Sequence, residues 1–299
     1  MADICPGRRI NVLNLLAPAK INLTLEVLAK RQNGFHEIRS VAQAISLCDR
    51  LTFQSGDGIE FKSSWPEWIP EESLVSRAVN LLQGTTGCSR GATIGVSKRI
   101  PLVSGLGGDS SDAAATLRGL NQLWGLGLSR EELLELSSQL GSDVAFFLYG
   151  GTDLLEGRGE IVTPLPPLPH RWVNIVMPPV PLLPEKTKQL YDSLNTNHYT
   201  DGQITSKLVE MLKAGGEFVP SLLFNTFENV AFTRFPEIRV ARAHIKKMGA
   251  ANIHLAGSGP ALFTLAEDKA QAEKLHALLQ KQRLASYLTE TLAVIEKVE

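Results

Sequence analysis

Residues 101–112 constrain the fold most, since three glycines stand there among small polar side chains: Pro-Leu-Val-Ser-Gly-Leu-Gly-Gly-Asp-Ser-Ser-Asp. Glycine adopts positive φ and lets the backbone approach a ligand with no Cβ atom in the way. Over residues 113–124 the apolar side chains then recur at helical spacing. A glycine loop that leads into a helix gathers unpaired N–H groups and the positive end of the helix dipole, so we expect it to bind phosphate.

Two common phosphate motifs do not account for this loop. A P-loop requires a lysine directly after its last glycine, and none follows Gly108. A dinucleotide fingerprint requires a third glycine where this chain has Ser110. A tight turn without a ligand also stays open at this point. The pattern to be explained is Pro-x-x-x-Gly-Leu-Gly-Gly-x-Ser-Ser-x-Ala-Ala.

Length and proline content predict two domains. The chain has 299 residues, enough for two compact units, and four of its prolines lie within residues 163–169. A proline-rich connector is semi-rigid and typical of a domain boundary, so we expect domains at 1–163 and 164–299. The second part reads as alternating strand and helix segments, an α+β order that suggests a ferredoxin-like arrangement.

Hydrophobic patterning predicts the individual elements. Alternating apolar residues over 21–27 indicate a half-buried strand, which we expect to follow a bend at 17–20. A turn is predicted at 33–34. The helical pattern over 72–84 is expected to end at Gly84. Further expected strands are 41–53, 92–96, 172–177, 253–255, 261–265 and 285–294, and further expected helices are 187–194, 203–213, 225–233, 237–248 and 269–281.

The charge balance argues against polyanionic partners. The formal net charge is −1, so we expect neither nucleic acid nor a membrane surface as a partner, and a small molecule held at a local site. No apolar run approaches the roughly 18 residues that span a bilayer, and residues 1–9 lack the apolar core of a signal peptide. Cys5, Cys48 and Cys88 are odd in number and lack metal-ligand spacing, which favours a cytoplasmic location. The oligomeric state, monomer or homodimer, is left open.

Lys20, Asn22, Phe35 and His36 are the first candidate site residues. A lysine at the start of a strand is usually a solvated cation, and an aromatic and a histidine after a turn usually serve packing. Alternatively, Phe35 would offer a ring for stacking on a base, and His36 would hydrogen-bond a pyrimidine edge.

Asp143 and Gly257 are two further candidates. Asp143 precedes the apolar run Val-Ala-Phe-Phe-Leu-Tyr, where an aspartate is ordinarily a helix N-cap. Gly257 lies in Ala-Gly-Ser-Gly-Pro, which is ordinarily a hairpin-like turn.

Taken in chain order, these motifs resemble the GHMP kinases, the superfamily named after galactokinase, homoserine kinase, mevalonate kinase and phosphomevalonate kinase. The matching segments are 18–22, 34–36, 101–114, 141–147 and 257–259. The resemblance covers nearly the whole chain and implies an α+β, two-domain GHMP kinase fold. Its N-terminal, ATP-binding domain would be ribosomal-protein-S5-domain-2-like and its C-terminal domain ferredoxin-like. ATP and Mg²⁺ are the implied cofactors, and an alcohol is the implied phosphoryl acceptor.

The resemblance also implies roles for single residues. Asp143 would take the proton of the acceptor hydroxyl, and Lys20 would stabilise that carboxylate and the developing charge. The ATP phosphates would be held by Pro101, Leu102, Val103, Ser104, Gly105, Leu106, Gly107, Gly108, Asp109, Ser110 and Ser111. The acceptor would be held by Asn22, Phe35, His36, Thr187 and Gly257. Gly-Phe-His replaces the Gly-Tyr-His of members that act on a cytidine diphosphate sugar alcohol, so cytosine recognition is expected without the tyrosine hydroxyl.

One departure and two alternatives stay open. Asp109 stands where the superfamily often has glycine; aspartate tolerates a left-handed backbone, and its carboxylate either faces solvent, which we favour, or helps to hold Mg²⁺. Ser110 and Ser111 are better hydroxyl ligands for phosphate or metal, but the metal site is left unassigned. A kinase with another alcohol, such as homoserine or mevalonate, and a nucleotide-binding sensor without catalysis are the alternatives.

Overall fold

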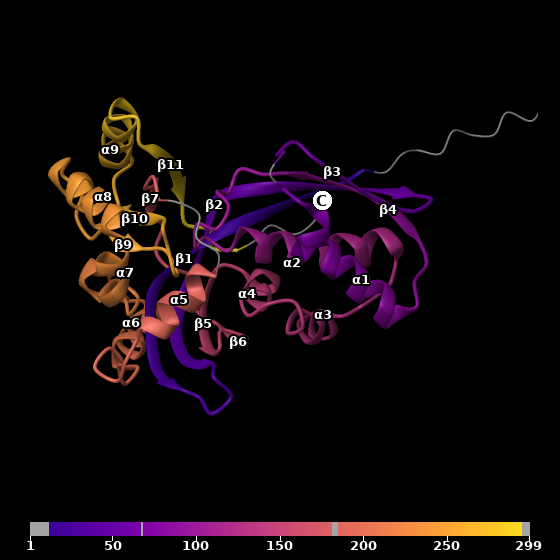
Figure 1. Cartoon of the computed structure of the whole chain (residues 1–299), viewed down its shortest axis with the longest axis horizontal. Coiled ribbons are helices and arrows are strands. Elements are labelled where there is room, and N and C mark those ends of the chain that lie inside the picture. The colour runs from indigo at the N-terminus through magenta and orange to yellow at the C-terminus, as the bar shows by residue number, and fades with distance from the viewer. Residues whose placement is uncertain (1–11, 67, 181–184, 295–299) are drawn as a thin grey trace, which may run out of the picture.

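The computed structural model describes residues 12–66, 68–180 and 185–294, which form two β-sheets with helices packed against them (Figure 1). In the first sheet the strand order is β3-β4-β2-β1-β8, and β5 pairs with β2 and β6 with β5. β1 and β2 form a long antiparallel pair at its centre. The strands are β1 (Leu13–Lys30), β2 (His36–Gly56), β3 (Ile59–Ser63), β4 (Gly91–Ser97), β5 (Thr152–Gly157), β6 (Ile161–Pro164) and β8 (Phe224–Asn225).

The helices α1 (Leu74–Thr86), α2 (Gly108–Trp124), α3 (Arg130–Ser137) and α4 (Val144–Tyr149) lie along one face of this sheet (Figure 1). A short 3₁₀ turn, Pro70–Glu72, precedes α1. α2 packs closely on β2 because Gly119 has no side chain; a Cβ atom there would lie 2.5 Å from the ring of Phe53. This packing holds the first turn of α2, and the glycine loop before it, over the centre of the sheet.

The second sheet is antiparallel and has the strand order β11-β7-β10-β9. Its strands are β7 (Trp172–Met177), β9 (His254–Leu255), β10 (Leu262–Ala266) and β11 (Ala285–Glu290). The helices of this half are α5 (Lys186–Ser193), α6 (Gln203–Lys213), α7 (Glu228–Arg234), α8 (Pro236–Lys247) and α9 (Lys269–Lys281), with a 3₁₀ turn at Pro220–Leu222.

The two sheets share a buried core. Val173 and Ile175 of β7 pack in one cluster with Ile21 and Leu23 of β1. Val176, on the other face of β7, packs with side chains of α8 and α9. Alternate residues of one strand thus face β1 and the helices, and the shared core brings the C-terminal half of the chain against the strand that carries Lys20.

Most expected elements are confirmed, and β7, α6 and α9 begin and end at the expected residues. The bend expected at 17–20 is wrong. β1 continues through it, and a register shift against β2 between Pro18 and Ala19 takes up the irregularity. A β-bulge of this kind accommodates proline without ending the strand.

The helix end expected at Gly84 is also wrong. α1 continues to Thr86, and Gly87 adopts the left-handed C-cap conformation with φ 67°. Patterning missed β3, β5 and β6, and the proline-rich stretch begins inside β6. The boundary between residues 163 and 164 stays a prediction, since β8 from the later part of the chain pairs with β1.

Candidate active site

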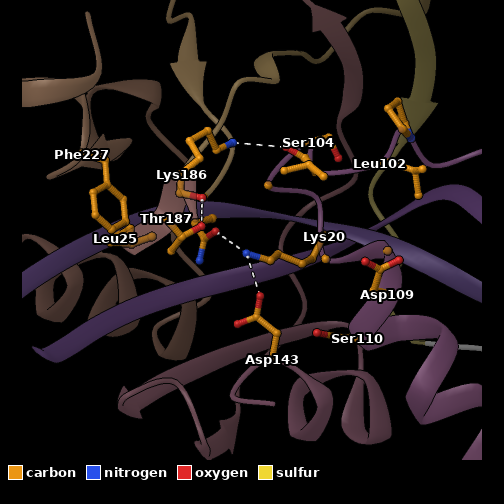
Figure 2. A pocket seen from close by; sticks show the side chains of 18 of the residues that line it. Lys20, Leu25, Leu102, Ser104, Asp109, Ser110, Asp143, Lys186, Thr187 and Phe227 are labelled. Carbon is orange, nitrogen blue, oxygen red and sulfur yellow. Dashed lines mark hydrogen bonds and ion pairs between the residues drawn. The ribbon is translucent and has the colours of Figure 1, made fainter. Parts of the chain in front are cut away.

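A cavity of about 280 Å³ lies between the glycine loop, β1, the start of α4 and the start of α5 (Figure 2). It brings together most of the residues singled out from the sequence. Those that line it are Lys20, Asn22, Pro101, Leu102, Val103, Ser104, Gly105, Gly107, Gly108, Asp109, Ser110, Asp143, Thr187 and Gly257.

Lys20 is the cation at the floor of the cavity. Its side chain is buried, and its Nζ donates to Asn22 Oδ1 at 2.8 Å and lies 3.3 Å from Asp143 Oδ2. Asn22 is oriented in turn, because its Nδ2 donates to Ser40 Oγ at 2.8 Å. The ordinary explanation, a solvated lysine, is therefore wrong for Lys20.

Asp143 occupies the N-cap position of α4, as its place before an apolar run suggests, but its side chain makes no capping hydrogen bond within the described chain. Its φ and ψ, −82° and −10°, are already helical, whereas a capping residue typically has extended geometry. The carboxylate points to Lys20 instead (Figure 2). The geometry leaves one carboxylate oxygen available to a ligand beside a fixed cation.

The glycine loop is held between β1 and the C-terminal turn of residues 256–260. Lys20 N–H donates to Leu106 O at 2.9 Å, and Ala261 N–H donates to Ser104 O at 3.1 Å. Gly105 has φ 85°, and a Cβ atom there would lie 2.1 Å from Ala256 O, so this position requires glycine. α2 begins at Gly108, earlier than expected, and N–H groups at the start of a helix suit an anion.

Gly257 brings the second half of the chain to the same place. A Cβ atom at Gly257 would lie 2.8 Å from Gly105 O and 3.3 Å from Lys20 Nζ. The turn is fixed by Asn225 of β8, whose Nδ2 donates to the carbonyls of Leu255 and Gly257, each at 2.8 Å. The sequence did not indicate a role for Asn225, since its contacts lie in a distant turn.

Lys98, beneath the glycine loop, was also missed. Its Nζ lies 2.7 Å from Asp49 Oδ2, 2.8 Å from Asp112 Oδ2 and 3.5 Å from Asp109 Oδ1. Burial alone would lower the pKa of Lys98, but these carboxylates outweigh it and raise the pKa above its usual value. Lys98 is therefore a fixed positive charge under the loop. The only signal in the sequence was its place just before the loop.

Asp109 lies in the first turn of α2, with its side chain 55% exposed. Its backbone is helical, so the left-handed conformation considered for this position does not occur; Val103 is the non-glycine residue of the loop with positive φ, 52°. In the described chain no group of three or more His, Cys, Asp or Glu side chains is placed to hold a metal ion.

Phe35 and His36 lie beside the cavity and do not line it. Phe35 is 52% exposed, with the Arg158 guanidinium 4.8 Å from its ring centroid. His36 is buried and stacks on Tyr191 at 4.7 Å between centroids; burial lowers its pKa. Arg158, which contacts Phe35, and Tyr191, which contacts His36, both line the cavity. Phe35 and His36 are thus each separated from the cavity by one residue.

Leu106 and Ser111 also lie outside the cavity wall. Leu106 is fully buried and contributes its backbone carbonyl to Lys20, and the buried Ser111 Oγ has no hydrogen-bond partner within the described residues. Thr187 and Ser258 both line the cavity, and their hydroxyl oxygens lie 2.8 Å apart. Lys186 lies beside them, buried, and burial lowers its pKa to about 8.

Known proteins resemble this chain over nearly its whole length. The model of the GHMP kinases N terminal domain matches residues 73–151, and that of GHMP kinases C terminal matches residues 208–282. The chain is 50% identical to the 4-diphosphocytidyl-2-C-methyl-D-erythritol kinase of Dehalococcoides mccartyi over 286 residues, which cover 95% of this chain and 100% of that protein. It is 38% identical to the kinase of the same name from Geobacillus kaustophilus over 269 residues, 88% of this chain and 91% of the other.

Solved structures agree. A crystal structure of 4-(cytidine 5'-diphospho)-2C-methyl-D-erythritol kinase is similar with a TM-score of 0.80 and 31% identity, covering 93% of this chain and 99% of that one. Homoserine kinase from Cytophaga hutchinsonii is similar in fold alone, with a TM-score of 0.67 and 20% identity, covering 99% and 100% of the two chains. The expected α+β GHMP kinase fold is thereby confirmed. No helix in the three described segments has the length and apolar character to cross a membrane.

Proposed function

The chain belongs to the 4-diphosphocytidyl-2-C-methyl-D-erythritol kinase family of the GHMP kinases, and we propose that it transfers the γ-phosphate of ATP to the 2-hydroxyl of 4-diphosphocytidyl-2-C-methyl-D-erythritol. The product is the 2-phosphate, a precursor in the non-mevalonate route to isoprenoids. The observation that carries the proposal is the Lys20–Asp143 pair, which faces a glycine loop and a helix start across one cavity. A nucleotide-binding sensor has no need of such a base.

In the proposed reaction the oxygen of the acceptor's 2-hydroxyl attacks the γ-phosphorus, and Asp143 accepts the proton of that hydroxyl. The bond from that phosphorus to the β–γ bridging oxygen breaks, and ADP leaves. Lys20, 3.3 Å from the carboxylate, orients Asp143 and stabilises negative charge near the attacking oxygen. Phosphoryl transfer depends mainly on positioning and charge stabilisation, which this fixed pair and the loop N–H groups would supply.

The ATP phosphates are proposed to lie along residues 101–111. The positive φ of Gly105 and Gly107 and the start of α2 at Gly108 support this, because they free N–H groups for an anion. Lys98 lies directly below, with its Nζ 3.4 Å from where a Cβ atom of Gly108 would be. Because its charge is paired with Asp49 of β2 and Asp112 of α2, its role is to hold the start of α2 on the sheet.

Mg²⁺ is the proposed metal partner of ATP. It prefers oxygen ligands and in kinases is held by one or two protein groups together with phosphates and water. Ser110 in the cavity wall fits such a role, and next to it the buried Oγ of Ser111, which has no hydrogen-bond partner among the described residues, offers a second hydroxyl oxygen. When bound, Mg²⁺ neutralises phosphate charge.

The acceptor is proposed to contact Asn22, Thr187 and Gly257, with its cytosine at Phe35 and His36. The open ring of Phe35 offers a stacking face, and His36 is held by Tyr191. Because burial lowers the pKa of His36, the ring is neutral at pH 7, so one ring nitrogen donates and the other accepts, as a pyrimidine edge requires.

We further propose domains at 1–163 and 164–299, a cytoplasmic location, and a monomer or homodimer.

The test is a substrate panel. Coupled ADP release is measured with 4-diphosphocytidyl-2-C-methyl-D-erythritol, homoserine and mevalonate at equal concentrations, and the product is analysed for a 2-phosphate. Turnover with the cytidine acceptor alone is expected. Turnover with homoserine or mevalonate would favour a related kinase, and ATP binding without turnover on any acceptor would favour the sensor.

A further inference from the structure

Lys186, the first residue of α5, is buried in the cavity wall, and its side chain extends toward the glycine loop (Figure 2). Its Nζ donates to the backbone carbonyl of Val103 at 3.2 Å and to that of Gly259. Val103 belongs to the glycine loop and Gly259 to the C-terminal turn. One ammonium group therefore joins the two halves of the chain at the cavity.

Lys186 differs from the other cations of the cavity in its partners. Lys20, Lys98 and Arg158 each have a carboxylate oxygen within 3.6 Å. For Lys186 no carboxylate of the described residues lies within 4.0 Å, and its partners are neutral carbonyls. A carbonyl oxygen carries only a partial charge, so the ammonium is desolvated without being neutralised. Its lowered pKa, about 8, is the consequence expected for such a group.

A buried cation with no carboxylate beside it among the described residues is suited to an anion that a ligand brings. We propose that Lys186 binds phosphate oxygens of a ligand in the cavity and so ties the C-terminal half of the chain to that ligand. The inference rests on the proposed kinase function, because both reactants then carry phosphate groups. An ammonium has three donors, so Lys186 can keep a carbonyl partner while it binds phosphate.

The phosphate has two sources, which different probes separate. Val103 lies in the loop proposed for ATP, and Thr187, next to Lys186, is proposed to contact the acceptor. ADP and CDP, titrated separately by calorimetry, therefore test the triphosphate side and the diphosphate side. Neither measurement requires turnover, so the panel above can fail while this test still gives a result.

Three variants separate charge from hydrogen bonding. Lys186→Gln keeps donors for the carbonyls and removes the charge, whereas Lys186→Arg keeps the charge. Lys188→Gln is the matched control, since Lys188 stands on the same helix with its side chain 68% exposed. We expect Lys186→Gln to weaken ADP or CDP binding about 10- to 100-fold and to flatten its salt dependence, the range of a charge-assisted hydrogen bond. Lys186→Arg should stay within about threefold and Lys188→Gln should bind as wild type.

Two results would overturn the proposal. Unchanged affinity for both nucleotides in Lys186→Gln would leave Lys186 as a link between two backbone segments. Equal losses in Lys186→Gln and Lys186→Arg would show that side-chain shape matters and charge does not. Thermal unfolding of each variant identifies one that fails to fold, and Lys186→Arg, which keeps the charge, then decides: wild-type affinity supports the proposal and lost affinity contradicts it.

Discussion

The Nζ of Lys20 lies 3.3 Å from Oδ2 of Asp143, with the lysine side chain 6% exposed and the aspartate side chain 36% exposed. The cation is thus fixed inside the protein, while the carboxylate faces the cavity from which a ligand would approach. The glycine loop fits against both β1 and α4 because Gly107 has no side chain: a Cβ atom there would lie 2.9 Å from Phe147 of α4 and 3.2 Å from the Lys20 side chain.

Asp143→Asn is expected to lower kcat by about 10²–10⁴, because an amide cannot accept the hydroxyl proton. ATP affinity and folding should change little, since the Asp143 side chain makes no capping bond within the described chain and is partly exposed. The measurement is kcat, the ATP Kd and the Tm of the variant. Asp268→Asn is the control: Asp268 is the N-cap of α9, accepts a hydrogen bond from Ala270 N–H at 2.8 Å, and should keep wild-type turnover. Wild-type turnover in Asp143→Asn would remove the base from the proposed reaction.

Phe35→Ala is expected to raise the KM for the cytidine acceptor several-fold, since stacking on a base is worth about 1–3 kcal/mol. Phe35 is 52% exposed, and it lies outside the glycine loop, so the KM for ATP should stay the same. Phe35→Tyr keeps the aromatic face and should behave as wild type. If Phe35→Ala leaves the acceptor KM unchanged, the cytosine is recognised elsewhere, and Tyr191 in the cavity wall becomes the next residue to test.

Much of this site could be predicted because its motifs are local. The glycine loop, the helix after it and the aspartate before α4 can each be recognised within about a dozen consecutive residues. Lys98 and Lys186 could not be found in this way, because their environments are made by distant segments. Lys98 is buried against Asp49 of β2, and Lys186 is buried by Val103 and Gly259. Charge alone does not tell such a lysine from a solvated one.

In the fold, too, local sequence predicts some features and contacts between distant segments determine the others. The bounds of α6 and α9 follow from local apolar spacing, which patterning detects. The continuity of β1 across Pro18 depends on a register shift against β2, a property of the pair and not of either strand. The two residues of β8 form a strand only because β1 lies beside them.

Asp109→Gly should leave Mg²⁺-dependent ATP binding within about threefold of wild type, well below the tenfold change that corresponds to about 1.4 kcal/mol. The carboxylate is largely exposed, and Lys98 keeps Asp49 and Asp112 as nearer partners. Binding is measured by titrating Mg²⁺ at fixed ATP, with Asp109→Asn as a control of similar shape. A strong rise in the Mg²⁺ requirement of both variants would place Asp109 at the metal and contradict the preference for solvent.

Asp153→Asn should remove a pH dependence of stability that the wild type carries. Asp153 is fully buried in β5, neither carboxylate oxygen has a hydrogen-bond partner in the described chain, and burial raises its pKa to about 7. The unfolded carboxyl titrates near pH 4, so between about pH 4 and 7 the folded protein holds a proton that the unfolded chain has lost. The free energy of unfolding therefore falls as pH rises through this window, by up to about 1.4 kcal/mol per pH unit, and levels off above the folded pKa.

An uncharged asparagine has no such term, so Asp153→Asn should gain stability relative to the wild type from pH 5 to pH 8, with most of the gain reached by pH 7. Urea unfolding of both proteins at pH 5, 6, 7 and 8 measures this difference directly, and comparing pH values within each protein cancels any constant effect of the amide on packing. For Asp268→Asn, at an exposed helix cap, the free energy of unfolding should depend on pH in the same way as for the wild type. Parallel curves for Asp153→Asn would mean that Asp153 ionises in the folded protein at the same pH as in the unfolded chain, and that its burial is relieved by water.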